Sequence, residues 1–361
     1  MKILILANND VGLFRFRREL IRQLLEKHTV LIALPYGDAV EQLKEDGCRF
    51  IDLPVDRRGI DPIKDGLLFL RCVRLLLREK PDLVITYTVK PNIYGGIACR
   101  MLRIPYAVNI TGLGTAFQRE GMLKKLVCAL YRCALKKAKR IFFENSENRA
   151  VFLQLKLAQK EQSMLLDGAG VDLPYFSYTD YPAGDTPLRF LFIGRIMKEK
   201  GVDELFAAMR RLHREGEVCT LDVLGGCEEN YAQSLKEGED EGWLHYHGFQ
   251  QDVRPFIAAS HCFVLPSYHE GMANTNLECA AMGRPLITSD IPGCREAVIP
   301  KESGMLIKPQ DENSLYETMK AFMALSSNER ALMGKKGREH MEHVFDKKKV
   351  VEMTLKGLGI S

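Results

Sequence analysis

The chain has 361 residues, of which 46% are hydrophobic and 27% are charged, so we expect a globular protein with two domains rather than one. No apolar run is long enough to cross a bilayer, which excludes an integral helical membrane protein. The charge is divided unevenly. Residues 1–170 hold 29 Lys+Arg against 18 Asp+Glu, a net +11, whereas the remainder holds 22 against 29, a net −7. The basic half is therefore expected to meet an anionic partner.

The ten cysteines are scattered singly, with no Cys-x-x-Cys pair, so neither a zinc site nor a disulfide framework is expected. The first seven residues are too short for a secretory signal and are typical of a β-strand. Together these features favour a reducing, cytoplasmic location.

Apolar strand-like runs alternate with helix-like runs along the first half, which is typical of a parallel sheet covered by helices. The expected strands are 3–7, 30–33, 83–86, 106–110 and 140–144, and the expected helices include 16–27 and 67–79.

The alternation breaks between residues 167 and 187, a stretch rich in Asp, Pro, Tyr and Gly that is typical of a linker. It then resumes, with expected strands at 189–193, 221–224, 262–265 and 285–289 and helices at 202–213, 252–260 and 314–325. We therefore predict an α/β fold of two Rossmann-like, doubly wound parallel-sheet domains, 1–170 and 171–345. The last residues, 346–361, are expected to form a helix that packs back on the first domain. Ligands of such sheets bind beyond the carboxyl ends of the strands, so we expect a site in the interdomain cleft.

Two acids stand close together late in the chain, Glu270 in segment 266–271 (PSYHEG) and Glu278. The first follows a strand on a loop, and the second lies one or two turns into a helix that Gly283 and Pro285 end. The free N–H groups and the dipole of that helix start favour an anion. The two acids could thus hold the hydroxyls of a sugar and a ribose while the helix start holds phosphates. Alternatively, they are a capping residue and a first-turn acid of a surface helix.

Segment 194–201 (GRIMKEKG) follows an expected strand and opens a helix. Its Arg195 and Lys200 could point at one anion, because a guanidinium fork and an ammonium together suit a diphosphate. They would stabilise the charge that develops as the diphosphate leaves. The alternative is a surface loop with solvated bases.

These segments together resemble the retaining glycosyltransferases of family GT4, and the spacing of Glu270 and Glu278 matches the family's E-x7-E motif. The resemblance covers most of the chain. Segments 87–92 and 110–115 look like loops of members that build bacterial polysaccharides and lipid-linked oligosaccharides, and segment 171–176 looks like the family's hinge. The resemblance implies a GT-B fold in which the first domain binds the acceptor and the second binds the nucleotide sugar.

The resemblance also implies roles for single residues. Arg195 and Lys200 would bind the diphosphate, and Glu270 would contact the transferred sugar. Glu278 would bond the ribose hydroxyls, segment 247–249 would cradle the base, and Met272 to Thr275 at the helix start would offer backbone N–H groups. Gly12, in a loop after the first strand, would let the backbone approach the phosphates. The full donor-side set is Gly12, Gly194, His247, Gly248, Phe249, Gly271, Met272, Ala273, Asn274, Thr275 and Glu278.

On the acceptor side the sequence departs from many GT4 relatives, which carry a histidine in an N-terminal loop. The first half contains only His28, and the corresponding loop has Val89 and Lys90. Lys90 is therefore a candidate for an acceptor or donor phosphate, or else a solvated loop lysine. The candidates for the acceptor or a phosphate are Arg15, Lys90, Asn92, Thr111 and Gly112.

No covalent nucleophile is assigned, because a loop and a helix do not guarantee the ~5 Å between carboxyl groups that double displacement requires. In the family the leaving diphosphate is thought to take the acceptor's proton. That chemistry needs no metal, and the sequence shows no Asp-x-Asp signature for one. We expect no cofactor.

Residues 122–140 contain seven bases and no acid. Met122, Leu123, Leu126, Val127, Leu130 and Tyr131 recur on one helical face. Such a helix could lie on an anionic bilayer, giving peripheral attachment to the inner face of the cell membrane. Equally, it could pack its apolar face on the sheet and leave its lysines in water. Nucleic acid is a weaker alternative, because no binding motif is present.

The prediction is a retaining glycosyltransferase, a hexosyl- or N-acetylhexosaminyltransferase, that uses a nucleotide-diphosphate sugar, with UDP favoured. The favoured acceptor is a lipid-linked saccharide. One alternative is a sugar-nucleotide epimerase on the same fold, and another is a non-catalytic nucleotide-sugar-binding protein. A dehydrogenase fits poorly, because Gly112-x-Gly114 lacks the third glycine and the following acid.

Overall fold

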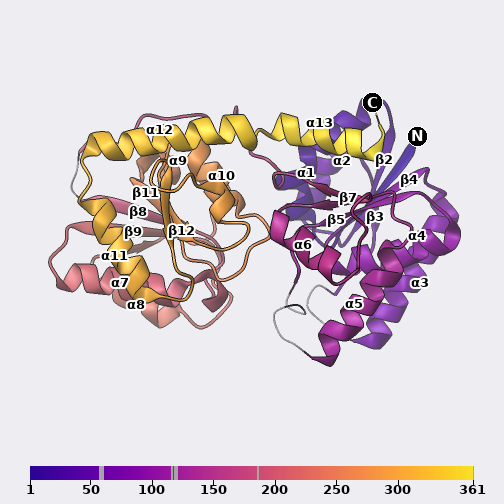
Figure 1. The fold of residues 1–361 in the computed structure, drawn as a ribbon, viewed down its shortest axis with the longest axis horizontal. Coiled ribbons are helices and arrows are strands. Elements are labelled where there is room, and N and C mark those ends of the chain that lie inside the picture. Colours follow the sequence, from indigo (N-terminus) through magenta and orange to yellow (C-terminus); the bar gives the residue numbers. More distant parts are fainter. Residues whose placement is uncertain (57–60, 115–116, 118–120, 185–186, 361) are drawn as a thin grey trace. The chain divides into compact units, whose positions relative to one another are not determined.

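The computed structural model describes residues 1–56, 61–114, 117, 121–184 and 187–360. The chain divides into two compact units (Figure 1). Unit 1 comprises Met1–Ala169 and Lys348–Ser361, and unit 2 comprises Gly170–Lys347. Thr115, in one of the GT4-like loops, and residues 185–186 of the expected linker lie outside the described residues.

Unit 1 is built on a seven-stranded parallel sheet in the order β3-β2-β1-β4-β5-β6-β7. The five predicted strands of this half are confirmed, and the edge strands β3 and β7 were not predicted because they are short. Every described pairing is parallel. The strands are β1 (Lys2–Leu6), β2 (Thr29–Leu34), β3 (Arg49–Asp52), β4 (Leu83–Tyr87), β5 (Tyr106–Ile110), β6 (Arg140–Phe143) and β7 (Ser163–Leu165).

Helices cover both faces of this sheet, and each face has its own apolar core. The C-terminal helix α13 (Lys347–Leu358) contributes Val350, Val351 and Leu358 to one of these cores. The Lys139 ammonium donates to the carbonyl of Leu358 at 2.6 Å, which fixes the end of that helix. The other helices are α1 (Asp10–Leu25), α2 (Ala39–Glu45), α3 (Pro62–Glu79), the π-helical turn η1 (Pro91–Gly95), α4 (Gly96–Leu102), α5 (Met122–Leu135) and α6 (Ser146–Gln154).

Helix α1 begins six residues earlier than predicted, and this corrects one expectation. The Asn9 side chain caps the helix by accepting from the Gly12 N–H at 2.5 Å. Gly12 therefore lies in the first turn of α1, not in a loop. A side chain there would meet Asn9 Oδ1 at 2.7 Å, so the cap itself accounts for the glycine.

Unit 2 has a six-stranded parallel sheet in the order β10-β9-β8-β11-β12-β13. The buried apolar side chains of this sheet and of its helices form a single large core. Again every described pairing is parallel. The strands are β8 (Leu188–Ile193), β9 (Cys219–Leu224), β10 (Leu244–Tyr246), β11 (Cys262–Leu265), β12 (Leu286–Ser289) and β13 (Gly304–Ile307).

The helices of unit 2 follow its strands, as expected for a parallel sheet. They are the short η3 (Lys198–Lys200), α7 (Val202–Arg214), α8 (Ala232–Asp240), α9 (Arg254–Ala259), α10 (Asn274–Ala281), η4 (Arg295–Ala297), α11 (Glu312–Met323) and α12 (Ser327–Val344).

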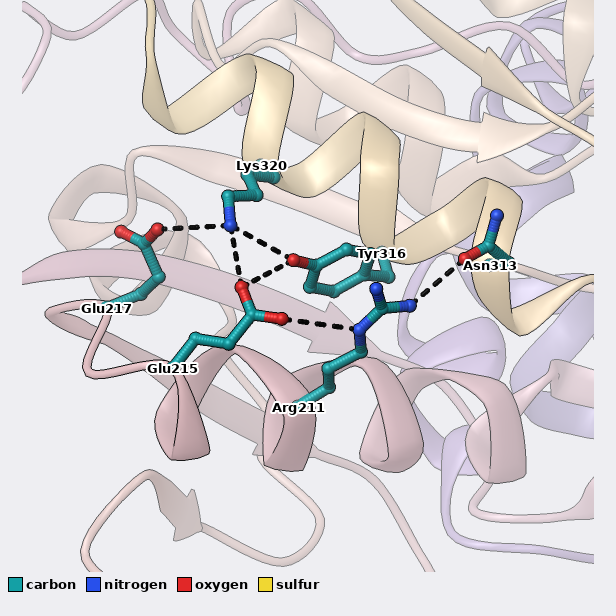
Figure 2. Close-up of polar contacts among 6 residues, drawn as sticks. All are labelled: Arg211, Glu215, Glu217, Asn313, Tyr316 and Lys320. Atoms are coloured by element: carbon teal, nitrogen blue, oxygen red, sulfur yellow. Dashed lines mark hydrogen bonds and ion pairs between the residues drawn. The ribbon is translucent and has the colours of Figure 1, made fainter.

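An ion-pair network joins α7 and α11 on the outside of unit 2 (Figure 2). Glu215 lies at its centre and accepts from the Lys320 ammonium at 2.6 Å and from the Tyr316 hydroxyl at 2.5 Å. Because of these two donors, the pKa of Glu215 falls to about 2. The Arg211 guanidinium stacks on the Tyr316 ring. The network holds two helices together and contains no feature of a binding site.

The predicted linker has no helix or strand among its described residues, but it is bound to unit 2. The Arg284 side chain is fully buried and donates to the carbonyls of Thr179 at 3.1 Å and Asp180 at 2.9 Å. At the start of this segment the Val171 N–H donates to the carbonyl of Phe345 at 2.7 Å. Unit 2 therefore includes most of the stretch that the sequence indicates as a connection.

No helix in the described ranges combines the length and the apolar character that crossing a bilayer requires. All ten cysteines are free thiols, and eight of them are buried.

Candidate functional site

The loops that follow β8 and β9 are joined directly beyond the ends of these strands. The Gly194 N–H donates to the Leu224 carbonyl at 2.9 Å, and the Ile196 N–H donates to the Gly226 carbonyl at 2.9 Å. Gly225 has φ +141°, and a side chain there would come within 1.8 Å of the Gly194 carbonyl oxygen. Only glycine fits this close approach. It fixes the backbone from which Arg195 extends.

Arg195 is half exposed and its Nη1 donates to Glu228 Oε2 at 2.9 Å. Glu228 lies on the loop after β9. Glu228 was not predicted, because it lies 33 positions from Arg195 along the chain.

Lys200 reaches the site through a second close approach. Gly201 has φ +71°, and a side chain there would come within 2.1 Å of the Pro266 carbonyl oxygen. The short helix η3 therefore packs closely against the loop that follows β11. As a result the Lys200 ammonium forms an ion pair with Glu270 Oε1, and both side chains are largely buried.

Glu270 is held by two donors at one oxygen. Besides Lys200, the Ser267 hydroxyl donates to Oε1 at 2.8 Å. Among the described residues Oε2 has no such partner. Two donors at Oε1 fix the orientation of this carboxylate. Ser267 is a further residue that was not predicted, although it lies in the same motif as Glu270.

Two further side chains, Tyr268 and Cys294, lie around Glu270. The Tyr268 hydroxyl donates to Glu204 Oε1 at 2.6 Å, and burial together with this carboxylate raises the pKa of Tyr268. The Cys294 thiol is fully buried, and desolvation followed by the nearby Glu270 charge raises its pKa well above the ordinary range. Cys294 is therefore a packing residue and not a nucleophile.

Helix α10 starts at Asn274, four residues after Glu270. Glu278 lies one turn further along and shares a face with Asn274. The first N–H groups of a helix have no intrahelical partner, so Asn274 and Thr275 can offer theirs to an anion. Ala273 cannot, because its N–H already donates to the Gly293 carbonyl at 2.7 Å. This corrects the expectation that all of Met272 to Thr275 offer free N–H groups. Gly271 and the buried Met272 lead into the helix start.

Segment 247–249 lies beyond the end of β10, at the same edge of the sheet. His247 Nε2 lies 2.7 Å from Asp222 Oδ1, and its ring packs on Phe256 at 4.7 Å between centroids. The Gly225 N–H donates to the Gly248 carbonyl at 2.8 Å, which ties this loop to the one after β9. Phe249 is 65% exposed, so its ring is accessible for stacking.

The residues predicted for the acceptor side all lie in unit 1, and the structure gives them different surroundings. Arg15 is exposed on α1, and Thr111 and Gly112 are half-buried just after β5. These three remain candidates.

Two other predicted acceptor residues are occupied by structural contacts. Asn92 is 1% exposed; its side chain accepts from Thr86 Oγ1 at 2.7 Å and donates to the Asn109 carbonyl at 2.8 Å. It joins β4 to β5 and has no surface to offer, so the acceptor role expected for it is wrong. The Lys90 ammonium forms an ion pair of 2.7 Å with Asp65 on α3, and both side chains are largely buried. Lys90 is thus neither solvated nor directed at solvent.

A buried cluster at the carboxyl ends of β4 and β6 was not predicted. Arg17 on α1 forms an ion pair with Glu144, and both side chains are about nine-tenths buried. The guanidinium lies 4.9 Å from the centre of the Tyr87 ring. Burial raises the pKa of Tyr87. The hydrophobic pattern of α1 gave no sign that one of its arginines faces the sheet.

No group of three or more His, Cys, Asp and Glu side chains within the described part of the chain is arranged to hold a metal ion.

Two family models match the chain. The one described as "Glycosyl transferase 4-like" matches residues 2–145, and the one described as "Glycosyl transferases group 1" matches residues 187–324. They correspond to the two sheets described above.

Curated relatives match over most of their length. An N,N'-diacetylbacillosaminyl-diphospho-undecaprenol alpha-1,3-N-acetylgalactosaminyltransferase from Campylobacter jejuni is 25% identical over 335 residues, covering 88% of each chain. A UDP-Gal:alpha-D-GlcNAc-diphosphoundecaprenol alpha-1,3-galactosyltransferase from Escherichia coli is 27% identical over 315 residues, covering 80% of this chain and 78% of the relative.

Solved structures share the fold at low sequence identity. Anabaena Alr3699/HepE, solved in complex with UDP and glucose, superposes with a TM-score of 0.81 at 16% identity, with 99% of each chain covered. WaaG, described as a glycosyltransferase involved in lipopolysaccharide biosynthesis, superposes with a TM-score of 0.75 at 15% identity, covering 98% of this chain and 99% of the other. With the motifs, the two parallel sheets and the family models in agreement, the chain belongs to the GT4-like glycosyltransferases of the GT-B fold.

Proposed function

We propose that this glycosyltransferase moves a sugar from a UDP-sugar to a hydroxyl of a lipid-linked saccharide, with retention of anomeric configuration. The observation that carries the proposal is the pair of ion pairs, Lys200 with Glu270 and Arg195 with Glu228, on the loops beyond the carboxyl ends of β8, β9 and β11. Two cations and an oriented carboxylate at one sheet edge are what a sugar diphosphate needs: charge neutralisation for the phosphates and an acceptor for sugar hydroxyls.

In the proposed reaction the bond between the anomeric carbon and the diphosphate oxygen breaks while the acceptor oxygen bonds to the same carbon. The acceptor's proton passes to the leaving diphosphate oxygen. Arg195 and Lys200 stabilise the negative charge that develops on that leaving group. Glu270, with Oε1 occupied by Lys200 and Ser267, orients the sugar through Oε2 and forms no covalent bond.

The donor and acceptor classes are carried over from relatives. The name of the Escherichia coli relative specifies a UDP-sugar and a diphosphoundecaprenol-linked acceptor, and that of the Campylobacter relative specifies a diphospho-undecaprenol-linked saccharide. Both names specify α linkages, which supports retention for an α-linked donor.

The experiment is a transfer assay with a panel of nucleotide sugars and a short-chain lipid-diphosphate-linked N-acetylhexosamine. We expect one UDP-sugar to give a product whose new linkage has the donor's anomeric configuration by NMR. Inversion of configuration would contradict the retaining mechanism. Isomerisation of the donor sugar with nucleotide release, but without any acceptor, would favour an epimerase. Donor binding without turnover under all conditions would favour a non-catalytic binding protein.

We also propose that transfer needs no metal ion, because Arg195 and Lys200 supply two positive charges where the diphosphate would lie. Treatment with EDTA should leave the rate unchanged. A loss of activity that Mg²⁺ or Mn²⁺ restores would contradict this part of the proposal.

A second part of the proposal concerns a membrane surface at unit 1. Eight of the sixteen large hydrophobic side chains that the described structure exposes lie on α3, α4 and α5, which neighbour one another (Figure 1). We call this surface the α3–α5 face. Its exposed apolar residues are Ile63, Leu67, Leu70, Leu77, Met101, Met122, Leu123 and Leu126.

Bases accompany these apolar residues on the same helices, among them Lys64, Arg71, Arg74, Arg78, Lys124, Lys125 and Arg132. Apolar side chains beside Lys and Arg favour the surface of an anionic bilayer, where a lipid-linked acceptor would reside. On α5 the buried side chains are Cys128, Tyr131, Ala134 and Leu135. Of the apolar face predicted for this helix, only Tyr131 is buried, because the buried side chains lie in the second half of α5.

Flotation with anionic liposomes tests this surface. We expect binding that weakens with salt and is lost in the Lys124/Lys125/Lys136/Lys137→Glu variant. The matched control reverses four exposed lysines of unit 2, Lys236/Lys301/Lys308/Lys335→Glu, and should still bind. Equal flotation of both variants and the wild type would discard the membrane proposal without affecting the transfer proposal.

A further inference from the structure

Both cations predicted to bind the donor diphosphate are already paired with a carboxylate. Lys200 is paired with Glu270, and Arg195 is paired with Glu228. A diphosphate that uses both cations must therefore share or replace these carboxylates. The two pairs differ in how exposed their side chains are.

The Lys200–Glu270 pair is enclosed. Its side chains are 18% and 13% exposed, and Ser267 holds the carboxylate from a second side. In the transfer reaction Glu270 has its own task at the sugar, so it remains in place when the donor binds.

The Arg195–Glu228 pair is open. Its side chains are 49% and 32% exposed. The backbone brings Glu228 to this place, since the Glu228 N–H donates to the Ile196 carbonyl at 3.2 Å and Ile196 pairs with Cys227. The neighbouring Glu229 does something different, because its carboxylate accepts from the Lys198 N–H at 2.8 Å and supports the loop.

We propose that Glu228 is a displaceable counterion for Arg195. In the free protein its carboxylate orients the guanidinium, and the donor diphosphate takes its place on binding. The proposal rests on the diphosphate role of Arg195 in the proposed function. Because the diphosphate must displace Glu228, this carboxylate lowers the affinity of the protein for the donor. No motif of the sequence indicates such a role.

The magnitude of the effect follows from the exposure of the pair. Exposed ion pairs contribute about 0.2–1 kcal/mol, so displacing Glu228 reduces nucleotide affinity by no more than about fivefold. A diphosphate compensates for the loss through charge-assisted hydrogen bonds from the same guanidinium. Replacing Glu228 by glutamine should therefore tighten nucleotide binding about two- to fivefold.

The experiment measures dissociation constants by isothermal titration calorimetry for UDP, GDP and ADP, with uridine as a probe without phosphates. The proteins are the wild type, Glu228→Gln, Arg195→Ala and the double variant Arg195→Ala/Glu228→Gln. The control is Glu237→Gln, which breaks another exposed Arg–Glu pair of unit 2, that with Arg210 at 3.1 Å.

If Glu228 is a counterion, Glu228→Gln binds the preferred nucleoside diphosphate about two- to fivefold more tightly at low salt, and the gain shrinks as salt rises. Glu228→Gln leaves the dissociation constant for uridine unchanged. Glu237→Gln binds the nucleotides with the dissociation constants of the wild type. In the Arg195→Ala background the glutamine substitution has no effect. Weaker or unchanged diphosphate binding by Glu228→Gln, or a gain that persists without Arg195, would overturn the proposal.

These outcomes separate the counterion role from the proposed function. If Arg195→Ala weakens diphosphate binding but Glu228→Gln brings no gain, only the counterion role fails. If Arg195→Ala leaves diphosphate binding unchanged, or if the wild type binds none of the three nucleotides, the diphosphate role of Arg195 fails and the counterion role fails with it.

Discussion

The carboxyl ends of the two parallel sheets use their charged residues in different ways. In unit 2 the charged side chains at this edge form two ion pairs across loops: Lys200 with Glu270, which is largely buried, and Arg195 with Glu228, which is exposed. In unit 1 the charged side chains at the same edge, Arg17 and Glu144, form a buried pair. The same sheet architecture therefore carries a candidate reaction site in one unit and a structural cluster in the other.

The difference lies in how the backbone turns after each strand. In unit 2 two glycines allow loops to approach each other closely, at Gly225 over Gly194 and at Gly201 over Pro266, and these loops carry Arg195, Lys200 and Glu270. In unit 1 a π-helical turn begins four residues after the end of β4, and its Asn92 is buried. Polar residues after a strand are thus candidates for binding only when the loop presents them.

The largest expected effect concerns the buried pair of unit 1. Arg17→Met should lower the free energy of unfolding by about 3–5 kcal/mol, because it leaves the Glu144 carboxylate buried without its partner. The double variant Arg17→Met/Glu144→Leu should recover most of this loss. Urea unfolding monitored by circular dichroism measures both. If Arg17→Met is as stable as the wild type, the Arg17–Glu144 pair is not structural and the contrast between the two units does not hold.

Glu270→Gln tests a charged residue at the carboxyl edge of the unit 2 sheet. We expect kcat to fall about 10²–10³-fold, because a neutral amide orients the sugar poorly and leaves Lys200 unpaired. The fold should remain intact, as judged by the thermal unfolding curve. Glu302→Gln, an exposed acid in the same unit, serves as the control and should keep full activity. Activity of Glu270→Gln within threefold of the wild type would remove Glu270 from the reaction.

Lys90→Met decides between a structural and a binding role at the edge of unit 1. Because Lys90 is paired with Asp65 in a largely buried position, we expect a loss of about 1–3 kcal/mol in stability. The KM for the acceptor should not change. A rise in that KM with unchanged stability would show that Lys90 binds the acceptor, and the contrast between the units would weaken.

The smallest expected effect concerns the Lys320–Glu215 ion pair, which lies outside the candidate site (Figure 2). In the folded protein the pKa of Glu215 is about 2, below its ordinary value of 4.5. Its contacts therefore stabilise the fold above about pH 4.5 and are lost as the pH falls toward 2. Glu215→Gln should be slightly less stable than the wild type at pH 7, and the difference should vanish near pH 2. Transfer activity at pH 7 should be unaffected.

Much of the fold could be predicted from the sequence, because buried parallel strands are continuous apolar runs. The bounds of the edge strands β3, β7, β10 and β13 could not, since short and partly exposed strands lack that pattern. The residues proposed for the donor side could be singled out because they occur in motifs that combine a strand end with glycine and charge. Glu228 was not found, because its contact with Arg195 depends on how two loops pair. Asn92 was misassigned because the sequence does not show that η1 turns it inward.

We propose that the carboxyl edge of the unit 2 sheet holds a nucleoside diphosphate between Arg195 and Lys200. A crystal structure of the protein soaked with UDP tests it most directly. We predict diphosphate oxygens within hydrogen-bonding distance of both side chains, the ribose at Glu278, and Arg195 turned from Glu228 to the phosphate. A UDP molecule bound elsewhere, or one that leaves Arg195 on Glu228 and makes no contact with Lys200, would contradict the account.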